Sequence, residues 1–130
     1  MKKGNKNSSI SFPKNFYWGA ATASYQVEGY NDNTDWAKAG KEGKVPCAGR
    51  LADHYHRYEE DFDIAKELGH NAHRFSIEWA RIEPQEGVFD EKEIEHYRDV
   101  LKALNKRGIT PLVTLWHFTL PLWFSESGGF

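Results

Sequence analysis

The sequence predicts an α/β fold in which parallel strands alternate with helices. Three strand-like segments alternate with two helical segments, so the pattern begins and ends with a strand. Each helical segment carries one apolar stripe, as is typical of a helix packed on the face of a sheet. Successive strand–helix–strand units of this kind form right-handed crossovers in a parallel sheet.

Two architectures contain such units, the doubly wound open sheet and the (β/α)8 barrel. A doubly wound sheet that binds a dinucleotide would carry the pattern G-x-G-x-x-G after its first strand. The corresponding segment here reads WGAATASYQVEG and lacks that pattern. The sequence therefore favours the N-terminal part of a (β/α)8 TIM barrel, with about three strands of the eight.

The first strand is predicted over residues 16–23, where small residues follow aromatic ones and suit close packing in a barrel. Residues 28–52 contain several glycines and many charges and are expected to form a long loop. Loops of that length in a compact domain tend to be functional or disordered.

The first helix is predicted to begin after Asp53, a candidate N-cap, and to end at Leu68, before Gly69. Its apolar stripe follows the spacing i, i+3, i+7 and i+10. The stripe consists of Tyr55, Tyr58, Phe62 and Ala65. The acidic residues of the same helix are expected to form a solvated face, and they are Glu59, Glu60, Asp61 and Asp63.

The second strand is predicted over residues 72–77, with a loop marked by Pro84 and Gly87 after it. Asp90 is expected to cap the second helix, and Glu93 has the spacing of a capping box. That helix repeats the same apolar spacing and ends before Gly108. Its stripe consists of Ile94, Tyr97, Leu101 and Leu104. The third strand is the apolar run over residues 109–116.

Composition excludes several classes of function. Lys and Arg number 17 against 19 Asp and Glu, and this near balance argues against nucleic acid as a partner. No apolar run approaches the ~20 residues that span a bilayer. Residues 1–11 lack the apolar region of a secretory signal and are expected to be a disordered leader before an incomplete barrel domain at residues 12–130. A single cysteine, Cys47, needs no oxidising compartment, so a cytoplasmic location is expected.

A metal site is not expected. Asp53, His54 and His56 are close in sequence, but residues two apart on a helix point to different sides. Aromatic residues make up 15% of the chain, which fits either a core of large side chains or stacking against the flat faces of sugars.

Four segments of the chain closely resemble glycoside hydrolase family 1. They are FYWGAATASYQVEG at residues 16–29, DHYHRYEEDFDIAKELGHNAHRFS at residues 53–76, HRFSIEWARIEP at residues 73–84 and TLWHFTLPLW at residues 114–123. The resemblance extends over residues 12–130 and implies a barrel that hydrolyses β-linked sugars with retention of configuration and without a cofactor. It also implies two catalytic glutamates, in Asn-Glu-Pro and Glu-Asn-Gly motifs after strands four and seven. Neither motif occurs here, so no catalytic residue is expected in this chain.

The resemblance also implies part of the site for the nonreducing sugar, the glycone. Gln26 matches a glutamine that binds two sugar hydroxyls, and His117 matches a histidine that binds the same sugar. Phe118 stands where many members have a tryptophan, so an indole N–H donor is missing. Arg74 matches an arginine that supports the nucleophile, and Glu28 is not expected to be a catalyst. Taken alone, a glutamine at a strand end or a lone histidine would more often be structural.

The leading interpretation is therefore part of a retaining β-glycosidase, similar to a β-glucosidase, whose partner is a β-linked sugar or oligosaccharide. One alternative is a barrel that has lost its carboxylates and binds carbohydrate or protein. Another is a short chain whose remaining strands come from a partner polypeptide. Because three strands cannot close a barrel, apolar strand residues are expected to be partly uncovered. They are Phe16, Trp18, Phe75, Val113 and Leu115.

Overall fold

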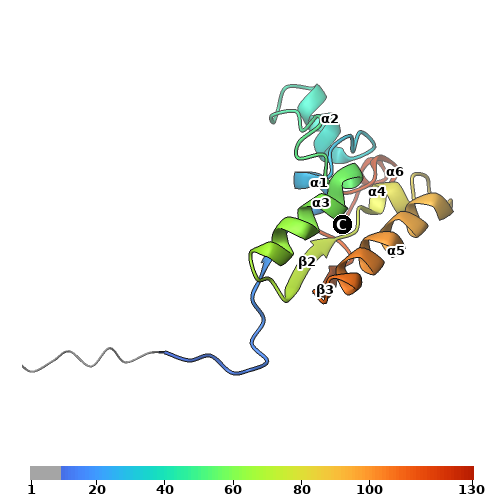
Figure 1. The fold of residues 1–130 in the computed structure, drawn as a ribbon. Helices are drawn as coiled ribbons and strands as arrows, with labels where there is room; N and C mark the ends of the chain where they lie inside the picture. The colour runs from blue at the N-terminus through green and yellow to red at the C-terminus, as the bar shows by residue number, and fades with distance from the viewer. Residues whose placement is uncertain (1–9) are drawn as a thin grey trace, which may run out of the picture.

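Three parallel strands form the sheet in a computed structural model that describes residues 10–130. The strands β1 (Gly19–Ala21), β2 (Ala72–Ser76) and β3 (Thr110–Thr114) lie in the order β1-β2-β3. The expected leader lies, for residues 1–9, outside the described residues. Figure 1 shows the sheet and the helices in front of it. The predicted α/β order of parallel strands with helical crossovers is confirmed.

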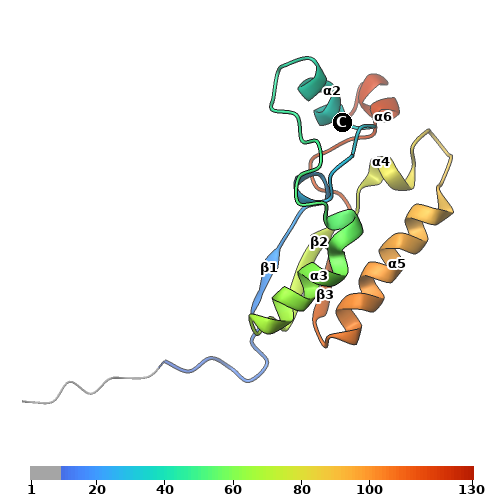
Figure 2. The same ribbon diagram turned by 45° about the horizontal axis from the view of Figure 1, so that its top comes forward.

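Two long helices cover one face of the sheet. Helix α3 (His54–Glu67) connects β1 to β2, and helix α5 (Glu91–Lys106) connects β2 to β3. Both lie on the same side of the strands in Figure 2. The core between helices and sheet is a cluster of buried side chains that includes Phe62, Phe75, Val100, Leu104 and Ile109.

The opposite face of the sheet is uncovered within residues 10–130. On this face Leu112, the register partner of Arg74, is 45% exposed. Val113 and Leu115 lie on the helix side of the edge strand and are 40% and 76% exposed, and Phe16 and Trp18 are also exposed. Phe75 was expected to share this exposure, and that prediction is wrong. Its side chain is turned toward the helices and is only 4% exposed. In a closed barrel, the face without helices is the interior.

The strands are shorter than predicted, most of all β1, which is shorter at both ends. Strand β1 spans three residues, and helix α1 (Ser24–Val27) begins soon after it. The close contact of β1 with β2 requires the glycine, since a Cβ on Gly19 would lie 1.9 Å from the carbonyl oxygen of Ala72. Small residues therefore allow close strand packing here, as the sequence indicated.

The segment predicted as a loop at residues 28–52 contains a further helix, α2 (Asp35–Lys41). The Thr34 hydroxyl caps it by accepting a hydrogen bond from the backbone N–H of Ala37, 3.1 Å away. Helices α4 (Trp79–Ile82) and α6 (Leu122–Glu126) were not predicted either. Each of these helices has seven residues or fewer, too few for an apolar period to stand out.

The caps of the two long helices differ from each other. Asp90 caps α5 as predicted, accepting from the backbone N–H of Lys92 at 2.9 Å. Asp53 precedes α3 in a left-handed conformation, with φ of 56°, and its side chain does not cap the helix. Its carboxylate instead accepts from His56 at 2.6 Å. The capping box is not formed, because the Glu93 carboxylate accepts from the Tyr55 hydroxyl, at 3.0 and 3.1 Å.

The acidic side chains of α3 are mostly exposed, as expected. Asp61 is the exception, because its carboxylate pairs with the buried His54 at 2.6 Å. His54 and His56 thus contact different carboxylates, those of Asp61 and Asp53. Across residues 10–130, no helix combines the length and the apolar character needed to cross a membrane.

Candidate functional site

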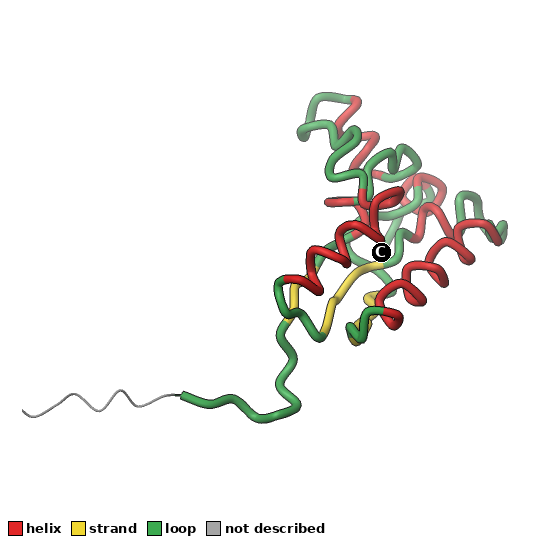
Figure 3. The backbone as a smooth tube through the Cα atoms, in the orientation of Figure 1, coloured by secondary structure: helices red, strands yellow, loops and turns green. Residues whose placement is uncertain are grey.

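The short helices α1, α2, α4 and α6 gather at the carboxyl ends of the three strands (Figures 2 and 3). This is the edge at which active sites of (β/α)8 barrels lie. The segments after β1 and after β3 are joined there by backbone contacts. Thr34 pairs with Pro121 in an antiparallel bridge, and the backbone N–H of Asp35 donates to the carbonyl of Leu120 at 3.0 Å. The Asp35 carboxylate accepts the Leu120 N–H in return, at 2.9 Å.

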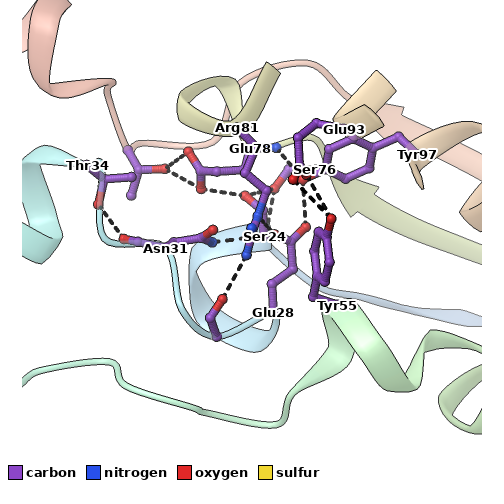
Figure 4. Close-up of polar contacts among 12 residues, drawn as sticks. Ser24, Glu28, Asn31, Thr34, Tyr55, Ser76, Glu78, Arg81, Glu93 and Tyr97 are labelled. Carbon is purple, nitrogen blue, oxygen red and sulfur yellow. Dashed lines mark hydrogen bonds and ion pairs between the residues drawn. The ribbon is translucent and has the colours of Figure 1, made fainter. Parts of the chain in front are cut away.

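A buried ion pair lies behind this edge. The Arg81 guanidinium in α4 donates through Nε to the Glu28 carboxylate at 2.8 Å and through Nη2 to the carbonyl of Gly29 at 2.8 Å. The other Glu28 oxygen accepts from the Tyr97 hydroxyl at 2.8 Å. Figure 4 shows these groups converging between the elements that carry them. Glu28 is thus held in a buried hydrogen-bond network with Arg81 and Tyr97.

A second buried carboxylate, Glu78, connects the segments that follow all three strands. Its oxygens accept from the hydroxyl of Ser24, which follows β1, at 3.0 Å. They also accept from the hydroxyl of Thr119, which follows β3, at 3.0 Å to each oxygen. Burial raises the pKa of Glu78 to about 7, and the charge of Glu28 adds to the shift, against the lowering effect of the hydroxyl donors. Sequence reasoning missed this residue, although an acid in the apolar context of FSIEW was a signal for it.

Three of the sequence-predicted site residues line one small pocket at the same edge. Gln26 reaches it from α1, and His117 and Phe118 reach it from the segment after β3. The His117 and Phe118 rings are 4.7 Å apart between centroids. Trp36 of α2 also lines this pocket and was not predicted individually. The high aromatic content was the signal that could have pointed to it.

Phe118 has a backbone conformation that bulky residues rarely adopt. Its φ is 70°, in the left-handed region, and its ring is exposed. For a residue other than glycine, such a conformation costs of order 1–3 kcal/mol and is concentrated at ligand-binding and catalytic sites. The observation marks the segment after β3 as a candidate binding element.

Arg74 does not line this pocket. It lies in the middle of β2, and its guanidinium donates through Nη1 to the carbonyl of Thr22 at 2.6 Å. Its neighbours in the strand, His73 and Phe75, pack against the helix layer, so Arg74 belongs to the opposite face of the sheet. It forms no ion pair within residues 10–130, which leaves part of its guanidinium free to contact an acidic group.

The comparisons with known proteins agree on one family. The family described as Glycosyl hydrolase family 1 matches residues 8–130. Beta-glucosidase A of Acetivibrio thermocellus is 42% identical over 94% of this chain and 30% of that protein. The structure of a β-glycosidase from Pyrococcus horikoshii is 47% identical, with a TM-score of 0.87 over 91% of this chain and 28% of that one.

A family 1 β-glucosidase from Thermotoga maritima is 38% identical, with a TM-score of 0.86 over 91% of this chain and 29% of that one. The chain thus spans less than a third of the length of each of these relatives. A family match over nearly all of this sequence, together with the same backbone in the solved structures, leads to one conclusion. The chain belongs to glycosyl hydrolase family 1.

Proposed function

We propose that this chain forms the first three strands of a retaining β-glycosidase barrel and supplies part of its glycone site. The observation that carries the proposal is the shared pocket of Gln26, His117 and Phe118 at the carboxyl ends of the strands. These side chains come from segments far apart in sequence, and the edge where they meet is the catalytic edge of this fold.

The chemistry of the pocket suits a sugar. The amide of Gln26 offers donors and an acceptor to neighbouring hydroxyls, and the His117 ring offers one of each when neutral. Neither side chain forms a hydrogen bond to another protein group within residues 10–130, so both are available to a ligand. Trp36 and Phe118 supply exposed aromatic surface against which an apolar sugar face can stack.

The catalytic step itself belongs to groups outside residues 10–130. In retaining enzymes two carboxyl groups act from opposite sides of the glycosidic bond, one as nucleophile and the other as acid and then base. In the proposed barrel these come from strands four and seven. Arg74, on the interior face of β2, would keep the nucleophile ionised by placing a fixed cation beside it.

The deciding experiment uses a complete barrel, in which this chain is continued by strands four to eight. Those strands come from its own gene or, where the reading frame ends at Phe130, from the Thermotoga maritima β-glucosidase. That relative has been solved in complex with deoxynojirimycin, which is a suitable glycone probe. Hydrolysis of an aryl β-glucoside, inhibited by deoxynojirimycin, supports the proposal.

The variants Gln26→Ala and His117→Ala test the role of this chain. Both should weaken deoxynojirimycin binding, whereas the matched controls Gln85→Ala and His56→Ala, at exposed positions away from the pocket, should not. Deoxynojirimycin binding without any hydrolysis would favour the non-catalytic barrel instead. Unchanged binding in both glycone variants would overturn the assignment of the site.

A further inference from the structure

We propose that Glu78 is a positioning residue that holds Gln26 and His117 at a fixed separation by bonding to both of the segments that carry them. The inference rests on the proposed function, because it assigns a task to Glu78 within the same glycone site. Glu78 itself does not line the pocket and is not a catalytic residue.

The contacts of Glu78 reach both sides of the pocket. On one side, Ser24 donates to it at 3.0 Å and lies two residues before Gln26 on the short helix α1. On the other side, Thr119 donates to it at 3.0 Å and lies two residues after His117. The carboxylate is therefore a two-sided bridge between these segments, in addition to the contacts of Thr34 with Pro121 and of Asp35 with Leu120.

Each side of the bridge is itself fixed to its neighbours. The backbone N–H of Ser24 donates to the Ser76 hydroxyl at 2.8 Å, which ties α1 to the end of β2. The Thr119 N–H donates to the carbonyl of His117 at 3.0 Å, and the Trp116 indole donates to the carbonyl of Thr119 at 2.9 Å. Moving Thr119 would thus move the backbone of His117 directly.

The surroundings of Glu78 indicate that it orients its hydrogen-bond partners and does not act through its charge. It is fully buried and has no cationic partner, since the nearby Arg81 is paired with Glu28. An uncompensated buried carboxyl group is costly, and an apolar side chain of similar size would pack at lower cost. An apolar side chain could not accept hydrogen bonds from Ser24 and Thr119 at once. The geometry accounts for a polar side chain here by the need to accept from Ser24 and Thr119 at once, and Oε2 accepts from both.

The test compares four variants of the complete barrel. Thr119→Val keeps the side-chain shape and removes one arm of the bridge, whereas Glu78→Ala removes both arms. Glu78→Gln keeps an acceptor and restores hydrogen bonding. Val100→Ala is the control, because Val100 is buried in α5 on the helix side of the sheet and its truncation lowers stability without removing a hydrogen bond of the bridge.

We expect Thr119→Val and Glu78→Ala to raise the inhibition constant of deoxynojirimycin about fivefold or more, since a net hydrogen bond is worth about 1 kcal/mol. Val100→Ala should change it less than about twofold, and Glu78→Gln should recover most of the loss. Inhibition constants are measured only for variants that near-ultraviolet circular dichroism shows to be folded, so Thr119→Val remains informative if Glu78→Ala does not fold.

A double-mutant cycle separates positioning from general stability. If Thr119 acts through His117, Thr119→Val has little further effect on the inhibition constant once His117 is alanine. Additive effects of the two substitutions, or inhibition constants in Thr119→Val no higher than in Val100→Ala, overturn the inference. Failure of the proposed function gives a different result, because Gln26→Ala and His117→Ala would then leave the inhibition constant unchanged.

Discussion

The Arg81 guanidinium lies 2.8 Å from the Glu28 carboxylate, and this ion pair joins the segment after β1 to the helix after β2. Both side chains are largely buried, and Arg81 also lies over the Tyr55 ring, 4.2 Å from its centroid. The pair therefore fixes the relative position of two segments at the carboxyl edge of the sheet.

Replacing Arg81 should be costly, because it leaves the Glu28 charge buried without its partner. In the complete barrel we expect Arg81→Met to lower the free energy of unfolding by about 3–5 kcal/mol. Adding Glu28→Gln should restore part of that loss by removing the orphaned charge. Urea denaturation measures both effects. Arg57→Ala breaks an exposed pair with Glu60 and should cost less than about 1 kcal/mol, and equal losses in Arg57→Ala and Arg81→Met would contradict the prediction.

Removing either glycone contact should slow turnover of the complete barrel. Hydrogen bonds to sugar hydroxyls strengthen in the transition state. Gln26→Ala and His117→Ala should therefore each lower kcat/KM, with a loss of transition-state stabilisation of roughly 2 kcal/mol. Steady-state kinetics with an aryl β-glucoside measures this, and thermal midpoints should change little. Two variants that melt earlier but keep wild-type kinetics would show that these residues are structural.

Phe118→Trp should strengthen glycone binding. The substitution adds an indole N–H donor at an exposed position that already has aromatic surface, while the left-handed backbone is no more strained by tryptophan than by phenylalanine. We expect the inhibition constant of deoxynojirimycin to fall by up to about fivefold, since a neutral hydrogen bond is worth about 1 kcal/mol. Phe118→Leu, which adds no donor, is the control, and an equal gain in both variants would exclude the donor as the cause.

The raised pKa of Glu78 predicts a characteristic pH dependence of stability. The folded state holds the proton up to pH about 7, whereas the unfolded glutamate titrates near 4.5. The contribution of Glu78 to the free energy of unfolding, on the order of 3 kcal/mol, is therefore fully present below pH 4.5 and is lost as the pH rises through 7. Burial lowers the pKa of His73 and of His96 to about 4, and these two give the opposite trend.

Comparison with Glu78→Gln isolates the glutamate, because both proteins contain the same histidines. The two should have similar free energies of unfolding at pH 5, and the variant should be the more stable at pH 8. Urea denaturation across this range measures the difference. A difference that stays constant with pH would mean that Glu78 titrates normally in the folded state.

The sequence was sufficient for the strand order and the long helices because both depend on repeated apolar spacing, as in the Phe62 stripe of α3. It was insufficient where a single long-range contact decides the structure. Asp53 is drawn to His56 rather than to the helix N–H groups, and Glu93 is drawn to Tyr55. Neither partner could be inferred from local spacing.

The same distinction applies to the site. Gln26 and His117 could be proposed as site residues because their sequence blocks match a family in register. The bridge from Ser24 through Glu78 to Thr119 depends on which side chains meet after three separate strands, and no periodic pattern encodes that meeting. Trp36 was missed because its helix lies in a segment that reads as a loop.

The 130-residue chain alone should not hydrolyse glycosides. It lacks both family carboxylate motifs, and catalysis with retention has no substitute for the two carboxyl groups. Incubation of the purified chain with an aryl β-glucoside should release aglycone at the rate of buffer alone, whereas the complete barrel should turn over. Activity that survives rigorous removal of host enzymes would contradict this.

The isolated chain is also expected not to behave as an independent folded domain. Strands β1 and β3 are both edges of the sheet, and an unpaired edge is a template for association. The sheet face without helices leaves Leu112 exposed, the edge strand β3 leaves Val113 exposed, and an apolar groove opens between α4, α5 and the end of β3. Its lining includes Ile77, Ile82, Ile94, Leu101 and Leu115.

Leaving these apolar surfaces uncovered is expected to remove the stability of the free chain. Each large apolar side chain contributes about 1.5–3 kcal/mol when fully buried, whereas a whole domain is stable by only about 5–15 kcal/mol. We therefore expect the free chain to be oligomeric, aggregated or molten, and to become monomeric and ordered when strands four to eight are supplied. Sedimentation and near-ultraviolet circular dichroism measure both states. A sharp monomer with fixed aromatic signals and cooperative melting, without those strands, would show that the helix-side core around Phe62 and Leu104 is sufficient and that the prediction is wrong.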